Sequence, residues 1–328
     1  MACRTHGVLV ARVPWARHGS RFTAAFEEQT AWLSAHAAKT TVSALMRTSW
    51  RSVTSMVARV VAEARAGTDR LEGLRRIGID DKSYKKGHKY LMVVVDHDTG
   101  RVVWAREGRD QDTVRAFFDD LGPARAARLS HVSCDGAMWI HDVITERAGQ
   151  ALICMDGFHV LQWATEAVDE VRRRITREAK TAGQPVVTGP TRWALLKSPP
   201  ALSGAQRATL AQIKKTNGPL YRAYLIKEQL RQAFAAKGET GRALLAGVIS
   251  WATRSRIPEM VKLAASLKTY QNTIRNTLDS GVNNGRVEAT NTHIQTLINR
   301  AYGYRTAEAL IAMIELKHGG LCPDLPGR

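Results

Sequence analysis

The chain has 328 residues and 44% of them are apolar, which is enough for two or three modest domains with hydrophobic cores. It contains no run of eighteen apolar residues and no long apolar N-terminal stretch, so we expect neither a membrane span nor a secretory signal. The four cysteines show no framework spacing, which favours a reduced, cytoplasmic setting.

The formal net charge of +18 is unevenly distributed. Residues 77–160 hold 11 Lys and Arg against 13 Asp and Glu, whereas residues 1–76 hold 12 against 5 and residues 161–328 hold 25 against 12. Basic surface attracts a polyanion through phosphate neutralisation and counterion release, and an acidic centre suits metal binding. A DNA partner is therefore expected, in association with the nucleoid. The alternative is a generally basic or ribosome-associated protein.

The first segment, residues 1–21, has no regular pattern. Cys3 and His6 have the spacing of half a zinc site. Because two ligands rarely hold structural zinc, we do not expect zinc here, and a free thiol with a surface histidine is the simpler interpretation.

Residues 22–65 have a helical pattern that is polar on one face. A tight turn is expected near residues 47–49, with Thr48 or Ser49 capping the helix that follows. This arrangement resembles a helix-turn-helix, although a plain helical hairpin packed on the next domain would give the same pattern. The residues expected at the exposed start of the recognition helix are Trp50, Arg51, Ser52 and Thr54.

From residue 77 the hydrophobic period changes to that of strands. IGID, YLMVVVD and RVVWARE read as three strands, the last two joined by an Asp-Thr-Gly turn. A short amphipathic helix, the strand LSHVSCD, a second helix and the strand ALICMD follow. The expected order is βββαβαβ, a mixed α/β layer, which is the order of RNase H-like folds.

The remainder of the chain, from residue 158 onward, is helical in pattern. Expected helices in its central part cover residues 205–215, 220–237, 241–254 and 258–280. Two more, at residues 287–301 and 306–318, follow a Gly/Asn loop.

Three carboxylates are the candidate catalytic groups. Asp80 and Asp135 end strands, and Glu288 lies near the start of a polar helix. Carboxylates gathered by a fold bind hard divalent cations, which promote phosphodiester chemistry. Each also has a purely structural interpretation, as a strand end, a helix cap and a first-turn glutamate. Asp156 and His159, after the next strand, are candidates for positioning groups.

The helix that carries Glu288 also carries polar and basic residues at helical spacing. Such a face suits contacts with phosphates or bases. Tyr302 and Tyr304 would either stack on an unpaired base or pack beneath the next helix. The residues expected to contact DNA here are Arg286, Asn291, Gln295, Arg300 and Arg305.

Four motifs together resemble the ISL-three family of bacterial insertion-sequence transposases: IGIDDKSYKKGHKYLMVVVDHDTGRVVW, SCDGAMWI, CMDGFHV and NNGRVEATNTHIQTLINRAYGYR. The resemblance implies an RNase H-like DDE domain with a helical insertion, and Asp80, Asp135 and Glu288 as its metal-binding triad. It further implies two Mg²⁺ ions (with Mn²⁺ as a substitute), strand cleavage and joining at element ends, and partners that include terminal inverted repeats and target DNA. A homo-oligomer on DNA is expected.

Two features depart from the family pattern. Family members begin with a cysteine zinc ribbon, and this chain resembles one truncated at Cys3 and His6. His293 and Gln295 stand where the family places basic residues. A noncatalytic DNA-binding element protein that acts as a repressor, and a structure-selective nuclease, therefore remain alternatives.

The domain boundaries expected from these patterns are as follows: residues 1–21, zinc-ribbon remnant; 22–70, helix-turn-helix region; 71–160, first part of the catalytic domain; 161–280, helical insertion; 281–328, the part that returns with Glu288.

Overall fold

The computed structural model describes residues 2–3, 7–8, 12–184 and 191–325. The chain divides into two compact units. The first comprises Met1–Val132, Asp142–Ala151 and Gly285–Arg328, and the second comprises Ser133–His141 and Leu152–Asn284. His6 and the side chain of Cys3, which formed the expected half zinc site, lie outside what is described.

The N-terminal part of the first unit is a set of three helices, preceded by the short antiparallel pair β1 (Ala2–Cys3) and β2 (Gly7–Val8). The helices are α1 (Ala24–His36), α2 (Lys39–Leu45) and α3 (Trp50–Ala66). The predicted turn before α3 is confirmed, with Arg47 at φ 48°. Ser49 is the cap, because its side chain accepts a hydrogen bond from the backbone N–H of Ser52.

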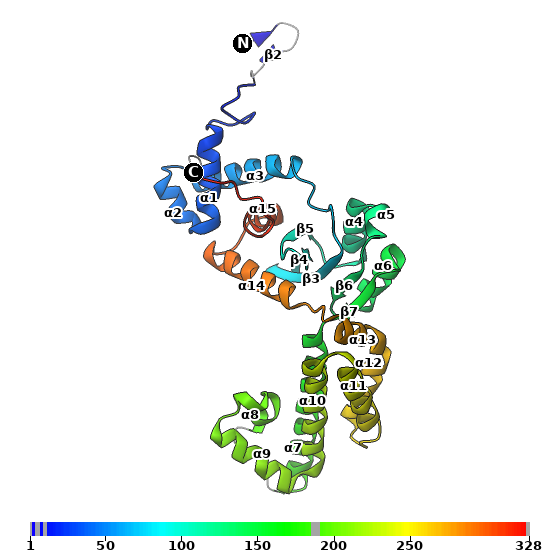
Figure 1. Cartoon of the computed structure of the whole chain (residues 1–328). Coiled ribbons are helices and arrows are strands. Elements are labelled where there is room, and N and C mark those ends of the chain that lie inside the picture. Colours follow the sequence, from blue (N-terminus) through cyan, green and yellow to red (C-terminus); the bar gives the residue numbers. More distant parts are fainter. Residues whose placement is uncertain (1, 4–6, 9–11, 185–190, 326–328) are drawn as a thin grey trace. The chain divides into compact units, whose positions relative to one another are not determined.

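A five-stranded mixed sheet follows (Figure 1). Its strands are β3 (Arg76–Lys85), β4 (Lys89–Asp96), β5 (Val102–Glu107), β6 (His131–Cys134) and β7 (Leu152–Met155), in the spatial order β5-β4-β3-β6-β7. β3 and β4, like β4 and β5, pair antiparallel. The β4–β5 turn forms because the Asp96 carboxylate accepts hydrogen bonds from the backbone of Asp98 and Thr99.

The helices between and after the strands are α4 (Gln111–Leu121), α5 (Pro123–Ala126), α6 (Met138–Ala148), α14 (Gly285–Arg300) and α15 (Ala307–His318). The expected βββαβαβ order is confirmed, with α5 as an additional short helix. One hydrophobic core joins apolar residues of α1, α3, α14 and α15 to β3, β4 and β5. The helix-turn-helix region and one face of the sheet therefore share a core within the first unit.

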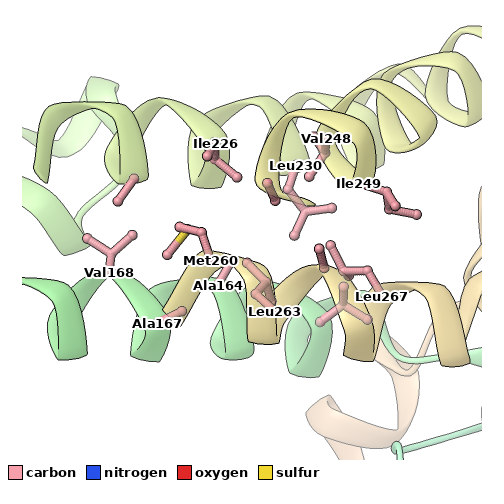
Figure 2. Packing of buried hydrophobic residues seen from close by; sticks show 14 of the residues in the cluster. Ala164, Ala167, Val168, Ile226, Leu230, Val248, Ile249, Met260, Leu263 and Leu267 are labelled. Carbon is pink, nitrogen blue, oxygen red and sulfur yellow. The ribbon is translucent and has the colours of Figure 1, made fainter. Parts of the chain in front are cut away.

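The second unit is mainly helical. Its helices are α7 (Gly157–Thr181), α8 (Thr191–Leu196), the 3₁₀ turn η1 (Pro199–Ala201), α9 (Gly204–Thr216), α10 (Gly218–Ala236), α11 (Gly238–Thr253), α12 (Pro258–Thr269) and α13 (Gln271–Ser280). Figure 2 shows its core, in which Val168, Leu230 and Met260 are fully buried. No helix in the described ranges is long and apolar enough to cross a membrane.

Residues 258–280 are helical as expected, but the segment is interrupted once. The chain forms two helices, α12 and α13, that meet at Tyr270, whose backbone leaves helical geometry at φ −98° and ψ 14°. The side chain of Tyr270 supplies a reason, because it is held by tertiary contacts with Trp163 and with the backbone of Gly136. These contacts join residues that are far apart along the chain, so local helix propensity does not predict them.

Candidate catalytic site and nucleic-acid interface

Asp80 lies in the middle of β3, directly opposite Val93 of β4. Directly opposed residues of paired strands share a face of the sheet, and Val93 packs in the core that contains Val287 and Ile294 of α14. Asp80 therefore points to the face that α14 covers. Its Oδ1 accepts a hydrogen bond from the Asp81 N–H, and its Oδ2 accepts one from Asn291 Nδ2, both at 2.8 Å.

Helix α14 brings Glu288 to the same region of the first unit. In Figure 1 this helix (orange) lies beside β3 (cyan), and the two elements are in contact. Glu288 is exposed in the first turn of α14. Asn291 follows it by three residues, a spacing that puts Cβ atoms about 5–6 Å apart on one helix face. Because Asn291 touches Asp80, Glu288 lies within one helical turn of that contact.

The start of α14 is fixed by a long-range contact. Arg286 Nη1 donates a hydrogen bond of 2.5 Å to the carbonyl oxygen of His97, in the turn between β4 and β5. Burial is the main cause that lowers the pKa of His97, to about 4. The nearby positive charges of Arg286 and Arg76 act in the same direction. His97 is therefore neutral at physiological pH.

Asp135 belongs to the second unit, immediately after β6. Its Oδ1 accepts a hydrogen bond from the backbone N–H of Ala137 at 3.0 Å. His141 Nε2 donates to its backbone carbonyl at 2.9 Å. The following residue, Gly136, accepts a hydrogen bond from the Tyr270 hydroxyl at 2.8 Å. A hydrogen bond within the loop, together with contacts from α6 and from Tyr270 at the end of α12, thus holds the loop that carries Asp135.

Asp156 and His159, expected as positioning groups, form a helix cap. The buried Asp156 carboxylate accepts a hydrogen bond from the Phe158 N–H, at the start of α7, through Oδ1. Its Oδ2 lies 2.9 Å from His159 Nδ1. The Asp156 N–H also donates to the Cys134 carbonyl, next to Asp135. These contacts stabilise the start of α7 and the end of β6.

A second acidic residue on β3 has a partner that the sequence did not reveal. Asp81 lies opposite Met92, on the face of the sheet away from Asp80. Arg109 Nε donates to Asp81 Oδ1 at 3.0 Å, and its guanidinium lies 4.7 Å from the Tyr90 ring centroid. Asp80 and Asp81 therefore lie on opposite faces of the sheet and contact different residues. Nothing in the local sequence marks Arg109 as the partner.

Within the ranges described, the structure contains no group of three or more His, Cys, Asp or Glu side chains arranged to hold a metal ion. Asp80 and Glu288 are in the first unit and Asp135 is in the second. Each carboxylate is a hard oxygen donor of the type that Mg²⁺ prefers.

Two family models match the chain. A transposase family model covers residues 77–314, and a model described as the helix-turn-helix domain of transposase family ISL3 covers residues 11–61. The chain belongs to the ISL3 (ISL-three) family of transposases. The match confirms the resemblance read from the sequence motifs, and it favours a helix-turn-helix over a plain helical hairpin at residues 11–61.

Individual relatives agree with the family models. The chain is 47% identical to the transposase for insertion sequence element IS1557 of Mycobacterium tuberculosis, over 99% of this chain and 78% of the relative. It is 30% identical to the transposase for insertion sequence element IS1001 of Bordetella parapertussis, over 74% of this chain and 61% of that relative.

The helix-turn-helix of this ISL3-family chain presents part of the predicted surface at the start of α3. Trp50 and Arg51 are exposed, and the ammonium group of Lys39 lies 4.6 Å from the Trp50 ring centroid. Lys39 also donates to the Thr54 hydroxyl, and the hydroxyls of Ser49 and Ser52 lie 2.9 Å apart. Burial lowers the pKa of Lys39. Contact of these residues with DNA stays a prediction.

The predicted DNA-contacting residues of α14 are in part engaged within the molecule. Arg286 and Asn291 make the contacts already described. Gln295 Nε2 donates to Asn299 Oδ1 at 3.0 Å, and Arg300 donates to the carbonyl oxygen of Ser34. Arg305 is exposed.

The two tyrosines after α14 differ. Tyr304 packs against the core of the first unit, and burial raises its pKa to about 12. Tyr302 is 93% exposed, with a positive φ of 54°. Packing beneath the next helix, one of the two interpretations left open by the sequence, therefore describes Tyr304 but not Tyr302.

Proposed function

We propose that this chain catalyses divalent-metal-dependent cleavage and joining of DNA strands at insertion-sequence ends, with Asp80, Asp135 and Glu288 as the metal-binding carboxylates. The observation that carries the proposal is the transposase family match over residues 77–314, a segment that contains all three carboxylates. The proximity of Asp80 to the first turns of the helix that bears Glu288 supports it.

The donor chemistry of the three residues suits the group that the reaction needs. When bound, two Mg²⁺ or Mn²⁺ ions would supply the Lewis acidity that activates an attacking hydroxyl and stabilises a leaving oxygen. Asp80 accepts hydrogen bonds at Oδ1 and Oδ2, and Asp135 accepts one at Oδ1. These contacts orient the carboxylates, each of which has about four acceptor sites.

The DNA is proposed to be held by basic surface and read by the helix-turn-helix. Residues 161–328 carry 25 Lys and Arg against 12 Asp and Glu, which favours nonspecific binding to phosphates. The exposed start of α3, with Trp50 and Arg51, suits the major groove. Since the reaction takes place on DNA, we expect the protein in the nucleoid.

The assembly is proposed to be a homo-oligomer on DNA. Transposition joins two element ends, and each end needs a helix-turn-helix and a catalytic centre. Sedimentation of the protein with and without end DNA would test this, and a complex with one chain per two ends would contradict it.

The test of function is a strand cleavage and strand transfer assay with Mg²⁺, on DNA that carries the inverted repeats flanking the gene. Asp80→Asn, Asp135→Asn and Glu288→Gln should each lower cleavage by more than about 100-fold, because the loss of a charge-stabilising group in such a site has an effect of that order. Asp112→Asn is the matched control, since the Asp112 side chain is 92% exposed in α4.

The outcomes separate the three candidate functions. Equal cleavage by wild type and Asp80→Asn would remove the enzymatic proposal. Specific binding to end DNA without cleavage would favour a repressor-like element protein. Cleavage without any joined product would favour a nuclease.

A further inference from the structure

The Asn291 side chain is unusual in how its two polar atoms are used. Its Nδ2 donates a 2.8 Å hydrogen bond to Asp80 Oδ2, whereas its Oδ1 is buried and has no hydrogen-bond partner among the described residues. A buried acceptor left without a partner costs about 1–3 kcal/mol. The Asn291 amide accepts this cost while its nitrogen donates to a candidate metal ligand, which indicates a role other than stabilising the fold.

The contact fixes the orientation of the Asp80 carboxylate. Its two oxygens are held by different parts of the chain, Oδ1 by the Asp81 backbone and Oδ2 by α14. The backbone donor comes from β3 itself, whereas the second contact ties Asp80 to another element, α14. That element also carries Glu288, three residues before Asn291.

The side-chain type agrees with this role. A Lys or Arg at this position would neutralise the Asp80 charge and compete with a cation, and a carboxylate would repel Asp80. An amide orients the carboxylate without changing the charge that attracts the metal. Partners of this kind around metal ligands typically contribute 10–100-fold to metal affinity or activity.

We propose that Asn291 is a positioning residue of the catalytic centre, which holds Asp80 in register with the first turns of α14 so that its carboxylate can receive a divalent cation. The inference rests on the proposed function, because it requires that Asp80 binds metal. It assigns Asn291 to the metal site rather than to the contact with DNA expected from the sequence.

The first experiment compares Asn291→Ala with wild type in the full chain bound to end DNA. Cleavage at saturating Mg²⁺ should fall about 10–100-fold and the Mg²⁺ concentration for half-maximal cleavage should rise by a similar factor. Binding to end DNA in EDTA should change less than about twofold.

Asn299→Ala is the matched control, because it removes the same type of side chain from the same helix. Among the contacts described, the Asn299 amide oxygen accepts a side-chain hydrogen bond only from Gln295. It should match wild type in all three measurements.

The second experiment has a readout other than activity. Mn²⁺ binding to the protein–DNA complex, followed by the electron paramagnetic resonance signal of free Mn²⁺, should be weakened about 10–100-fold by Asn291→Ala. Asn291→Asp keeps the shape but sets a carboxylate against Asp80. It should lower the unfolding temperature at pH 7.5 without metal, and added Mn²⁺ should restore that temperature more than it does for wild type.

The outcomes of these experiments distinguish failure of the positioning role from failure of the proposed function. If Asn291→Ala weakens DNA binding in EDTA as much as cleavage, or leaves the Mg²⁺ and Mn²⁺ midpoints unchanged, the positioning role is refuted. If Asp80→Asn retains full cleavage, the proposed function itself fails. A strong effect of Asp80→Asn with no effect of Asn291→Ala removes only this inference.

Discussion

The guanidinium of Arg300 donates a hydrogen bond of 3.0 Å to the backbone carbonyl of Ser34. Ser34 lies in the last turn of α1, where carbonyl groups have no partner within the helix. Arg300 is near the end of α14, so this contact ties the helix that bears Glu288 to the helix-turn-helix region. A second contact, at 3.4 Å, reaches the carbonyl of Ala35.

Replacement of Arg300 by Ala should therefore act on stability. Loss of a charge-assisted hydrogen bond at a partly buried helix end is expected to lower the free energy of unfolding by about 1.5–3 kcal/mol, measured by urea denaturation. The dependence of DNA affinity on salt should keep its slope. Unchanged stability with a slope reduced by about one would instead identify Arg300 as a phosphate contact, as the sequence predicted.

Gly136 is expected to tolerate no side chain. A Cβ atom there would lie 2.6 Å from Met155 Cε and 2.8 Å from Trp163 Cζ2. Gly136→Ala should lower the free energy of unfolding by about 1–3 kcal/mol through overpacking and displace the loop that carries Asp135. DNA cleavage at a temperature where the variant is fully folded should then fall as well. Gly204→Ala is the control, since nothing lies within 4 Å of the added atom; equal behaviour of the two variants would contradict this account.

His318 makes stability depend on pH. Burial, together with the charges of His293 and Lys317, lowers its pKa to about 4. The unfolded chain takes up a proton near the ordinary pKa of about 6.5, so stability is fully present above that pH and is lost as the pH falls from about 6.5 to 4. Because the ring is partly exposed, the free energy of unfolding is expected to fall by only about 1–2 kcal/mol over this pH range.

His318→Leu should remove this contribution. Its Nε2 is buried without a partner in the described part of the chain, so the substitution should leave stability at pH 7.5 unchanged or raise it. Urea denaturation at several pH values should show a flatter profile between pH 6.5 and 4. An identical profile for the variant and wild type would show that His318 is not the group responsible.

Local signals in the sequence predicted the helices and strands better than the tertiary contacts of individual side chains. The short apolar runs IGID and YLMVVVD predicted β3 and β4, and the capping chemistry of Thr48 and Ser49 predicted the start of α3. The contact between Asn291 and Asp80 spans 211 positions, and that between Tyr270 and Gly136 spans 134. Such pairs depend on how the chain returns to the sheet, which helical periodicity does not encode. Polarity and helical spacing after Glu288 therefore predict a contact of Asn291 with DNA and do not reveal its contact with Asp80.

The same limit applies to Arg286 and Arg300. Both are basic residues on α14 that fit a DNA-binding face by spacing. Both donate to backbone carbonyls of distant segments, at His97 and Ser34. A basic side chain and a phosphate form the same kind of hydrogen bond as a basic side chain and a helix-end or turn carbonyl. Sequence alone does not distinguish the two partners.

Lys227 is the buried cation of the helical unit. Its Nζ donates to the Leu195 carbonyl at 2.7 Å, at the end of α8, and lies 2.8 Å from Glu228 Oε1. Burial lowers the pKa of Lys227, while Glu228 acts in the opposite direction. Lys227→Met keeps the apolar stem but removes the charge, so Glu228 stays buried with only Arg231 as its ion-pair partner among those described.

Such a change should lower the free energy of unfolding by about 3–5 kcal/mol, the range for breaking a buried pair from one side. Hydrogen exchange at residues 191–196 should rise, because α8 loses the donor at its C-terminal end. Adding Glu228→Gln to Lys227→Met should recover part of the loss, since the uncompensated charge is then removed. If the double variant is as unstable as the sum of the two single variants, the coupling between Lys227 and Glu228 is absent and the stabilising contact of Lys227 is with the α8 carbonyls alone.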